Sequence, residues 1–316
     1  MDYQINNGVA AVLRTIVYYD IFNYPLTEKD ILNDCGISKE IVSPCRDALK
    51  FLVDEKIVFR LGEYYSLNNN YKDVERRIKG NEEAKKWIKK SQRFSHFISW
   101  FPFVRGISLS GSLSKGFVDE DPDIDYFIIT KPNRLWVARS LLIAFKKIFL
   151  LNSYKYFCLN YFIGQDNLEI EEKNLFTATE IVTMIPVFGN HVKRSFFESN
   201  DWIKSFYPNF EVDEMEDVPF NKSYTLKRLL EFLMKGKMGD RLDAWFMKKT
   251  VRHWANKYGD SFSEEEFLIT FKSGKNVSKH HPQNFQKKVL EKFNQKLKEI
   301  ETQHEIKIEN ILVELN

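Results

Sequence analysis

One segment constrains this chain more than any other: residues 109–130, which read LSGSLSKGFVDEDPDIDYFIIT. A Gly-Ser pair, Gly111 and Ser112, is followed after ten residues by two carboxylates one residue apart, Asp123 and Asp125. An apolar run, Tyr126–Ile129, follows at once. Positions i and i+2 of a strand lie on the same face. The segment therefore predicts a strand, a glycine turn and a second strand that presents two neighbouring carboxylates.

Two carboxylates held this close repel each other unless a cation lies between them. Mg²⁺ is the oxygen-seeking cation that such a pair binds, usually with substrate phosphates completing its shell. We therefore expect Asp123 and Asp125 to be metal ligands. The backbone N–H groups of the Gly111-Ser112 turn are expected to face a phosphate. Lys115 in the following loop is expected either to contact a phosphate or to be a solvated loop charge.

Composition narrows the class of protein without identifying it. The chain has 316 residues, 43% of them apolar and 15% aromatic, which is ample for packed cores, and its net charge of +3 does not indicate a nucleic-acid partner. No apolar stretch reaches the ~20 residues that a membrane span needs, and the N-terminus lacks the pattern of a signal peptide, so no membrane partner is expected. Three cysteines at no metal-binding spacing (Cys35, Cys45 and Cys158) predict reduced thiols in a cytoplasmic protein.

Residues 1–70 are expected to form a small domain with a winged-helix arrangement. Helical patterns span Val9–Phe22, Thr27–Gly36 and Lys39–Glu55, and two short strands, Ile57–Arg60 and Tyr64–Leu67, flank a turn. Winged helices commonly bind DNA, but this one holds seven Lys and Arg against ten Asp and Glu, a net charge of −3. Since phosphate contacts dominate DNA affinity, a structural or protein-contact role is favoured over DNA binding.

Residues 71–200 are expected to form an α+β core around a mixed sheet. A long basic helix, Val74–Trp100, precedes strands at Gly106–Ser110, Ile124–Thr130 and Tyr156–Ile163, with a fourth at Leu168–Glu171. The remaining helices are Pro132–Leu150, whose Arg134 and Arg139 are expected on its surface, and Thr177–Ile185.

Residues 201–316 are expected to form a helical C-terminal domain, reached through a linker at Asn200–Pro219. The strongest helical patterns are Leu226–Lys235, Asp240–Tyr258 and Phe285–Glu301, and residues 220–316 carry a net charge of +6. His280 and His281 lack further ligands at metal spacing and are expected in a loop near an anionic ligand. Three tryptophans are expected in the core or at an interface: Trp202, Trp245 and Trp254.

The segment from Gly111 to Ile129 resembles the nucleotidyltransferase superfamily of the DNA polymerase beta type. The match consists of an apolar strand, Gly-Ser, a ten-residue loop and DID followed by YFII. The whole chain is similar, more loosely, to a bacterial and archaeal group that places a winged helix before the transferase core and a helical domain after it. The motifs that carry this wider resemblance are CLNYF at Cys158–Phe162 and FTATEI at Phe176–Ile181.

The resemblance implies transfer of a nucleoside monophosphate from an NTP to an acceptor, with Mg²⁺ bound by Asp123 and Asp125 and phosphates held by Gly111, Ser112 and Lys115. It also implies a third carboxylate on a later strand, which acts on the attacking hydroxyl. The expected strand carries Asn160, so Glu169 is assigned this catalytic role, with Glu171 and Glu180 as alternatives and loss of the carboxylate as another.

Two functions are therefore expected from the sequence. The first is an Mg²⁺-dependent nucleotidyltransferase whose acceptor is a small molecule, a protein side chain or an RNA end. The second is a non-catalytic nucleotide-binding regulator that uses its winged helix for contacts with a partner or with DNA. The intact Gly111-Ser112 and Asp123-Asp125 motifs favour the first, and the missing third carboxylate favours the second.

Overall fold

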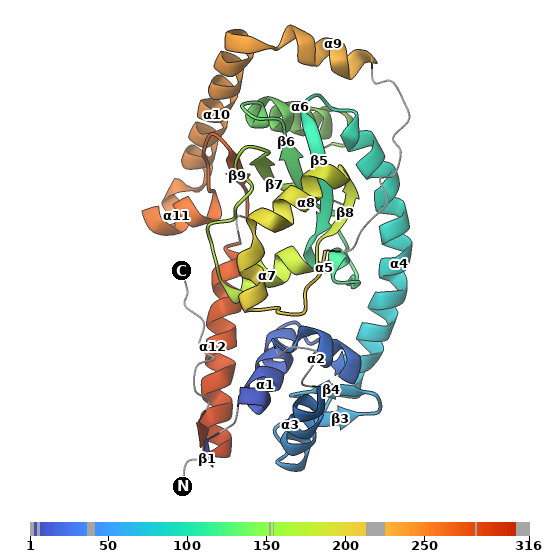
Figure 1. Cartoon of the computed structure of the whole chain (residues 1–316). Coiled ribbons are helices and arrows are strands. Elements are labelled where there is room, and N and C mark those ends of the chain that lie inside the picture. The colour runs from blue at the N-terminus through green and yellow to red at the C-terminus, as the bar shows by residue number, and fades with distance from the viewer. Residues whose placement is uncertain are drawn as a thin grey trace.

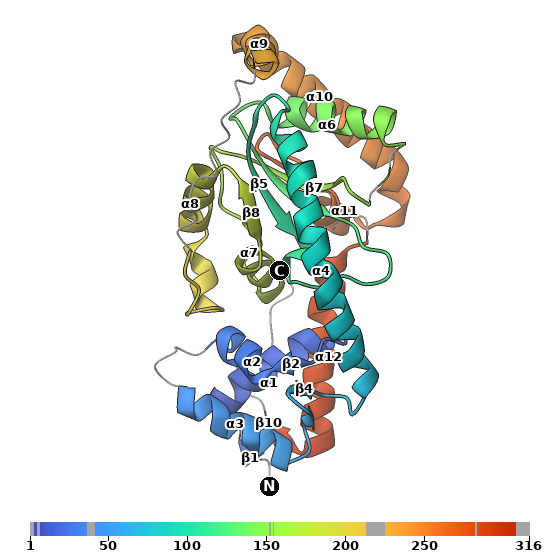
Figure 2. The ribbon, with the colours of Figure 1, turned by 90° about the vertical axis from the view of Figure 1, so that its right-hand side faces the viewer.

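The computed structural model describes residues 3–4, 7–36, 42–151, 153, 155–212, 225–281 and 283–307. The molecule combines many helices with a mixed five-stranded sheet and a smaller antiparallel sheet, which confirms the α+β class (Figure 1). An N-terminal unit lies at one end of the molecule, next to the core that contains the large sheet. Two long helices, residues 71–99 and 285–304, run from one to the other (Figures 1 and 2).

The central sheet has the strand order β8-β5-β6-β7-β9. Its strands are β5 Val104–Ser110, β6 Asp125–Thr130, β7 Cys158–Gly164, β8 Ile185–Phe188 and β9 Val277–Lys279. Strands β6 and β7 are parallel and every other neighbouring pair is antiparallel. Five of the six residues of β6 are buried, which explains why its sequence is a continuous apolar run rather than an alternating one.

Three core helices match predicted ones with small shifts at their ends: α4 Tyr71–Ser99, α6 Leu135–Phe149 and α7 Leu175–Val182. Two further helices, α5 Gly111–Ser114 and α8 Asn190–Ser199, were not predicted. Helix α6 is the crossover that parallel strands β6 and β7 require. The asparagine side chains of Asn70 and Asn174 accept hydrogen bonds from backbone N–H groups in the first turns of α4 and α7.

The expectation that Arg134 and Arg139 lie on the surface of α6 is wrong, because both are buried. The guanidinium of Arg134 pairs with Asp240 at 2.5 Å and donates to the backbone carbonyl of Met234 at 3.0 Å. Arg139 lies against the ring of Trp254, 4.7 Å from its centroid. A neighbouring helix covers this face of α6, and periodicity within α6 could not show that.

The predicted fourth strand at Leu168–Glu171 is also wrong. The side chain of Asn200, which is fully buried, accepts a hydrogen bond from the N–H of Ile170 at 2.8 Å and donates to the carbonyl of Leu168 at 2.8 Å. One amide therefore satisfies the backbone groups that a neighbouring strand would otherwise pair. Leu168 and Ile170 are buried, which is why their spacing resembled a strand.

The N-terminal unit, defined here as residues 7–36 and 42–66, contains the expected three helices and hairpin. The helices are α1 Asn7–Asp20, α2 Glu28–Asp34 and α3 Val42–Asp54, and the sheet has the order β2-β4-β3, with β2 Leu26–Thr27, β3 Phe59–Leu61 and β4 Tyr64–Ser66. Thr27 and Asp30 form a capping box at the start of α2. The predicted start of the third helix, residues 39–41, lies outside the described residues.

The C-terminal region is less purely helical than expected. Its elements are η2 Asp201–Ser205, α9 Thr225–Leu233, α10 Gly236–Tyr258, η3 Gly259–Ser261, α11 Glu264–Thr270, β9, α12 Phe285–His304 and β10 Ile306–Lys307, which pairs with β1 Tyr3–Gln4. The three strongest predicted helices are confirmed as α9, α10 and α12. The expectation of helix throughout is wrong, since β9 completes the central sheet by pairing with β7.

The predicted linker at Asn200–Pro219 is wrong over its first residues, where Ile203 and Tyr207 are buried in the core. Its remainder, residues 213–219, lies outside the described part of the chain. In the described residues, no helix is long and apolar enough to cross a membrane.

Candidate functional site

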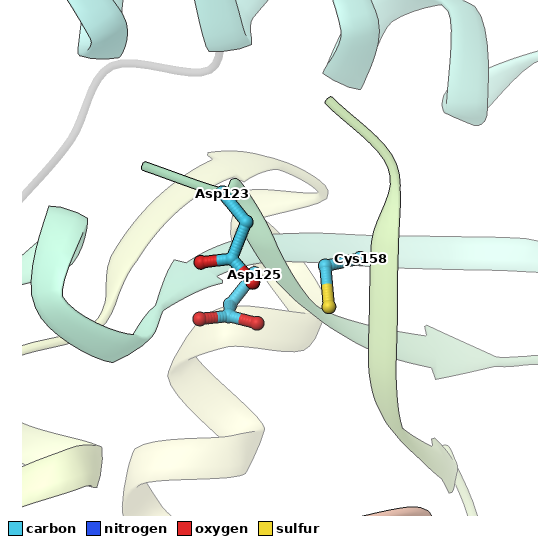
Figure 3. Close-up of side chains that lie close together, drawn as sticks. All are labelled: Asp123, Asp125 and Cys158. Atoms are coloured by element: carbon cyan, nitrogen blue, oxygen red, sulfur yellow. The ribbon is translucent and has the colours of Figure 1, made fainter. Parts of the chain in front are cut away.

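The two aspartates lie at one edge of the central sheet, where three strands meet. Asp125 is the first residue of β6, opposite Ser110 at the end of β5 and opposite Cys158 at the start of β7. Asp123 precedes β6, and Figure 3 shows its carboxylate beside that of Asp125, with the Cys158 thiol on the neighbouring strand. The sheet register therefore brings together the Gly-Ser turn and the carboxylate pair, as the sequence predicted.

Gly111 is the residue that permits this close approach. Its φ of +69° is in the left-handed region, and a Cβ built at this position would lie 2.3 Å from Oδ2 of Asp125. Any other residue would both strain the backbone and collide with the carboxylate. Ser112, the next residue, is exposed and its position borders the same space.

The Asp123–Asp125 pair is electrostatically strained in the absence of a cation. Burial, reinforced by the neighbouring charges of Asp123 and Glu180, raises the pKa of Asp125 to about 7. A carboxyl that prefers to hold its proton near neutral pH is a group that a bound divalent cation would convert to its charged form. The raised pKa therefore fits a metal ligand and does not fit a surface carboxylate.

Asn160 and Cys158 form a hydrogen-bonded chain behind Asp125. Nδ2 of Asn160 donates to Oδ1 of Asp125 at 2.5 Å, and the thiol of Cys158 donates to Oδ1 of Asn160 at 3.3 Å. Burial and the nearby carboxylates raise the pKa of the Cys158 thiol, so the sulfur stays protonated. Asn160, which stands where the resemblance implies a third carboxylate, therefore orients Asp125 through its amide nitrogen.

The structure does not bring Glu169 to the aspartate pair. Its carboxylate is exposed and pairs with Lys173 at 2.6 Å, and Glu171 is likewise exposed and pairs with Lys272 at 2.7 Å. Both lie on the segment that Asn200 holds out of the sheet, so the strand expected to carry them inward does not exist. The assignment of Glu169 as the third carboxylate is therefore contradicted by its position.

Glu180, the other alternative, does face the site. It lies on α7, borders the same pocket as Asp123 and Asp125, and its Oε1 lies 2.6 Å from Nζ of Lys115. Lys115 also donates to the carbonyl of Gly111 at 3.2 Å. The predicted phosphate-facing lysine and a candidate third carboxylate therefore form one largely buried ion pair at the site.

These residues line a pocket of about 900 Å³ between the core, the N-terminal unit and the start of α12. The loop Ile21–Tyr24 of the N-terminal unit forms one wall, and residues Gln283–Gln286 form another. The loop after Gly111 is fixed to α4, because the side chain of Asn81 donates to the carbonyl of Gly116 at 2.6 Å. The walls of the pocket are therefore built from segments that are far apart in sequence.

Sequence reasoning did not single out several polar residues of this pocket. Glu172 lies 3.2 Å from Lys272 and 3.9 Å from Lys279, and Lys279 donates to Oε1 of Gln286 at 3.0 Å. The hydroxyl of Thr270 is buried without a hydrogen-bond partner among the described residues. Glu172 sits beside Glu171 in a charged run, so only its burial distinguishes it from its neighbours.

His280 and His281 line the pocket as well and lie in a loop, as expected. Burial, with the nearby charge of Arg139, lowers the pKa of His280 to about 3, and burial, with Lys279, lowers that of His281 to about 4. Both imidazoles are therefore neutral at pH 7 and add no positive charge to the pocket.

The donor set fits a hard divalent cation. Within the described part of the chain, one group of three Asp, Glu, His or Cys residues offers ligand atoms that all lie within 4.8 Å of one another: Asp123, Asp125 and Cys158. The protonated thiol is a poor ligand, so the two carboxylates remain as the groups that could hold a metal, and their oxygens suit Mg²⁺ or Mn²⁺ better than Zn²⁺. The rest of the coordination shell would have to come from water and substrate.

Comparison with known proteins adds no relative to this description: no family model, no curated protein and no solved structure matches the chain.

Proposed function

We propose that this protein binds an NTP with Mg²⁺ in the pocket at the edge of the central sheet and transfers the nucleoside monophosphate to a hydroxyl acceptor. The observation that carries the proposal is the carboxylate pair Asp123–Asp125, placed against Gly111 in the lining of a pocket of about 900 Å³. Two ligands of the right chemistry, a phosphate-permissive glycine turn and room for a nucleotide occur together at one place.

The chain supplies distinct groups for the two parts of a bound nucleotide. Asp123 and Asp125 would hold the metal, which supplies Lewis acidity at the phosphates when bound. Gly111 has no side chain, so a phosphate could approach its backbone closely, and the exposed residue Ser112 follows it. Lys115 lies next to Gly111, so a small rotation of its side chain would bring the ammonium to a phosphate oxygen.

We assign the role of the third carboxylate to Glu180 in place of Glu169. In the structure Lys115 holds Glu180 at 2.6 Å. A triphosphate that attracts Lys115 would weaken this pair and leave Glu180 as the free carboxylate beside the aspartates. It would then accept the proton of the acceptor hydroxyl as the oxygen bonds to the α-phosphorus and pyrophosphate leaves.

A second function is favoured by one specific observation. No glutamate joins the close group of Asp123, Asp125 and Cys158 in the described residues, and the N-terminal unit forms part of the pocket wall through Ile21–Tyr24. A nucleotide in the pocket would therefore touch the N-terminal unit directly. This arrangement supports a non-catalytic regulator in which nucleotide binding alters contacts made by that unit.

Incubation of the purified protein with each α-labelled NTP, Mg²⁺ and a cell extract tests these functions. A labelled product that Asp123→Asn and Asp125→Asn both abolish supports the transferase and reveals the acceptor class. Mg²⁺-dependent NTP binding without labelled product or pyrophosphate release supports the regulator. Absence of both binding and product would overturn both.

A further inference from the structure

Helix α9 is attached to the core through its polar side chains. Nζ of Lys227 donates to the carbonyls of Ser99 at 2.8 Å and Val104 at 3.0 Å. Four residues later, Glu231 pairs with Arg105 at 2.8 Å and accepts the N–H of Phe103 at 2.7 Å. Because residues i and i+4 share one face of a helix, the face turned toward the protein is the charged one.

The opposite face of α9 is apolar and exposed. Leucine and phenylalanine side chains occupy it, and a methionine and a tryptophan of α10 are also exposed. These six side chains are between 52% and 69% exposed: Leu226, Leu229, Phe232, Leu233, Met238 and Trp245. This is the reverse of an ordinary surface helix, which buries its apolar face. Several large apolar side chains exposed on one helix face indicate an interaction site.

The turn between α9 and α10 is fixed, so this surface has a defined shape. The guanidinium of Arg134 donates to the carbonyls of Met234 at 3.0 Å and Gly236 at 3.1 Å and pairs with Asp240 at 2.5 Å. A Cβ on Gly239 would lie 2.0 Å from the carbonyl of Met234 and 2.6 Å from the guanidinium of Arg134, so only glycine permits this packing.

Charge identifies the partner of this surface. All three acidic residues of 225–252 are engaged with the core: Glu231, Asp240 and Asp243, the last accepting the N–H of Val137 at 2.9 Å. Seven Lys and Arg residues are exposed and make no ion pair among the described residues: Arg228, Lys235, Lys237, Arg241, Lys248, Lys249 and Arg252. We call these cations and the six apolar side chains the α9–α10 surface. It is positive and apolar, and no acidic residue of this segment offsets its charge.

A second copy of the chain is a poor partner, since the two positive surfaces would repel each other. Phe, Trp and Leu interspersed with Lys and Arg are instead the side chains of helices that lie on anionic membranes, where aromatic groups enter the headgroup region and cations meet lipid phosphates. Figures 1 and 2 show α9 at the end of the molecule opposite the N-terminal unit, and no other described helix or strand lies beyond it.

We infer that the α9–α10 surface binds the anionic face of a lipid bilayer. This is peripheral binding, and it involves no helix that crosses the membrane. The expectation of no membrane partner rested on the lack of a spanning segment, which peripheral binding does not require. The inference does not depend on nucleotide chemistry in the pocket.

Cosedimentation of the full chain with lipid vesicles tests the inference. We expect binding to phosphatidylcholine vesicles that contain about one third phosphatidylglycerol and at least about tenfold weaker binding to pure phosphatidylcholine. Raising NaCl from about 0.1 M to about 0.5 M should release most of the bound protein. The variant Leu229→Ser/Phe232→Ser should bind at least about tenfold more weakly, because it removes two side chains that would enter the lipid.

Two further variants make the test specific. Arg241→Glu/Lys249→Glu should lower binding to the anionic vesicles by about tenfold or more. Leu268→Ser, which changes a 63% exposed leucine on α11, should bind like the unchanged protein. Circular dichroism would verify that each variant is folded.

Equal binding to neutral and anionic vesicles, or equal loss in the Leu268→Ser control, would overturn the inference. The inference would also be overturned if the unchanged protein did not bind vesicles but self-associated in sedimentation velocity or bound a single-stranded RNA. In either case the Leu229→Ser/Phe232→Ser variant would have to abolish that interaction. Those results would assign the α9–α10 surface to a second copy or to nucleic acid.

Discussion

Nζ of Lys115 lies 2.6 Å from Oε1 of Glu180, and both groups border the pocket that holds Asp123 and Asp125. The two side chains are largely buried, at 17% and 22% exposure, so loss of either leaves an unpaired charge in a poorly solvated place. The pair joins the loop after the Gly-Ser turn to helix α7, which follows it by more than sixty residues. It therefore couples the phosphate side of the pocket to its candidate base.

A double-mutant cycle measures this coupling. Without nucleotide, Lys115→Met and Glu180→Gln should each lower the free energy of unfolding. The double variant should lose less stability than the two single losses added together, and the difference is an interaction energy of about 1–3 kcal/mol in urea unfolding. Saturating NTP and Mg²⁺ should reduce that energy if Lys115 turns to a phosphate. An unchanged interaction energy with nucleotide bound would show that the pair is only structural.

Glu180 and Glu169 can be separated by activity. Glu180→Gln should lower the rate of nucleotidyl transfer by about 100-fold with NTP binding retained, because an amide cannot accept the proton. Glu169→Gln is the matched control, since Glu169 is exposed and pairs with Lys173, and it should stay within about twofold of the unchanged protein. The reverse result would restore the assignment made from sequence.

Asp123→Asn and Asp125→Asn should each weaken Mg²⁺-dependent ATP binding by at least about tenfold in calorimetry, since each removes a charged oxygen ligand. The fold should be retained, because an asparagine at position 125 keeps an oxygen for the hydrogen bond from Asn160. Asp121→Asn, an exposed change in the same loop, is the control and should leave ATP affinity unchanged. Unaltered affinity in both site variants would refute the metal assignment.

The raised pKa of Asp125 predicts a pH dependence of stability. The carboxyl loses its proton near pH 4 in the unfolded chain and near pH 7 in the folded protein, so the folded state holds more protons between these values. The stability from this group is complete below about pH 4 and is lost as the pH rises through about 7.

Urea unfolding should show that the free energy of unfolding falls from about pH 5 to pH 8. This fall should be larger in the unchanged protein than in Asp125→Asn by on the order of 2 kcal/mol. The comparison is necessary because burial also raises the pKa of Asp34, to about 6, and that group contributes equally to both proteins. Mg²⁺ should oppose this loss of stability, since it binds the charged form of Asp125. Parallel pH curves for the two proteins would contradict the predicted shift.

Asn200→Ala should destabilise the protein by about 2–4 kcal/mol, because it removes the partner of two backbone groups in the segment Leu168–Ile170 and of the carbonyl of Phe196. Asn167→Ala, an exposed change in the same region, should stay within about 0.5 kcal/mol. Urea unfolding checks both, and equal effects would mean that Asn200 does not hold this segment.

The sequence alone determined the local parts of the site. Gly111, Asp123 and Asp125 could be assigned because a turn and two strands form within about twenty consecutive residues, where spacing fixes which side chains share a face. Helices α4, α10 and α12 were predictable for the same reason, since their apolar periodicity is a property of neighbouring residues.

Only the tertiary structure decided what meets the aspartates from elsewhere in the chain. Asn200 removes the strand expected to carry Glu169, and helix α7 instead places Glu180 beside Lys115. Strand β9 and the outward apolar face of α9 were likewise invisible in the sequence. Each of these features depends on a partner that is far away in the chain. The spacing of apolar residues in a segment shows that the segment has an apolar face, but it does not show whether another element covers that face.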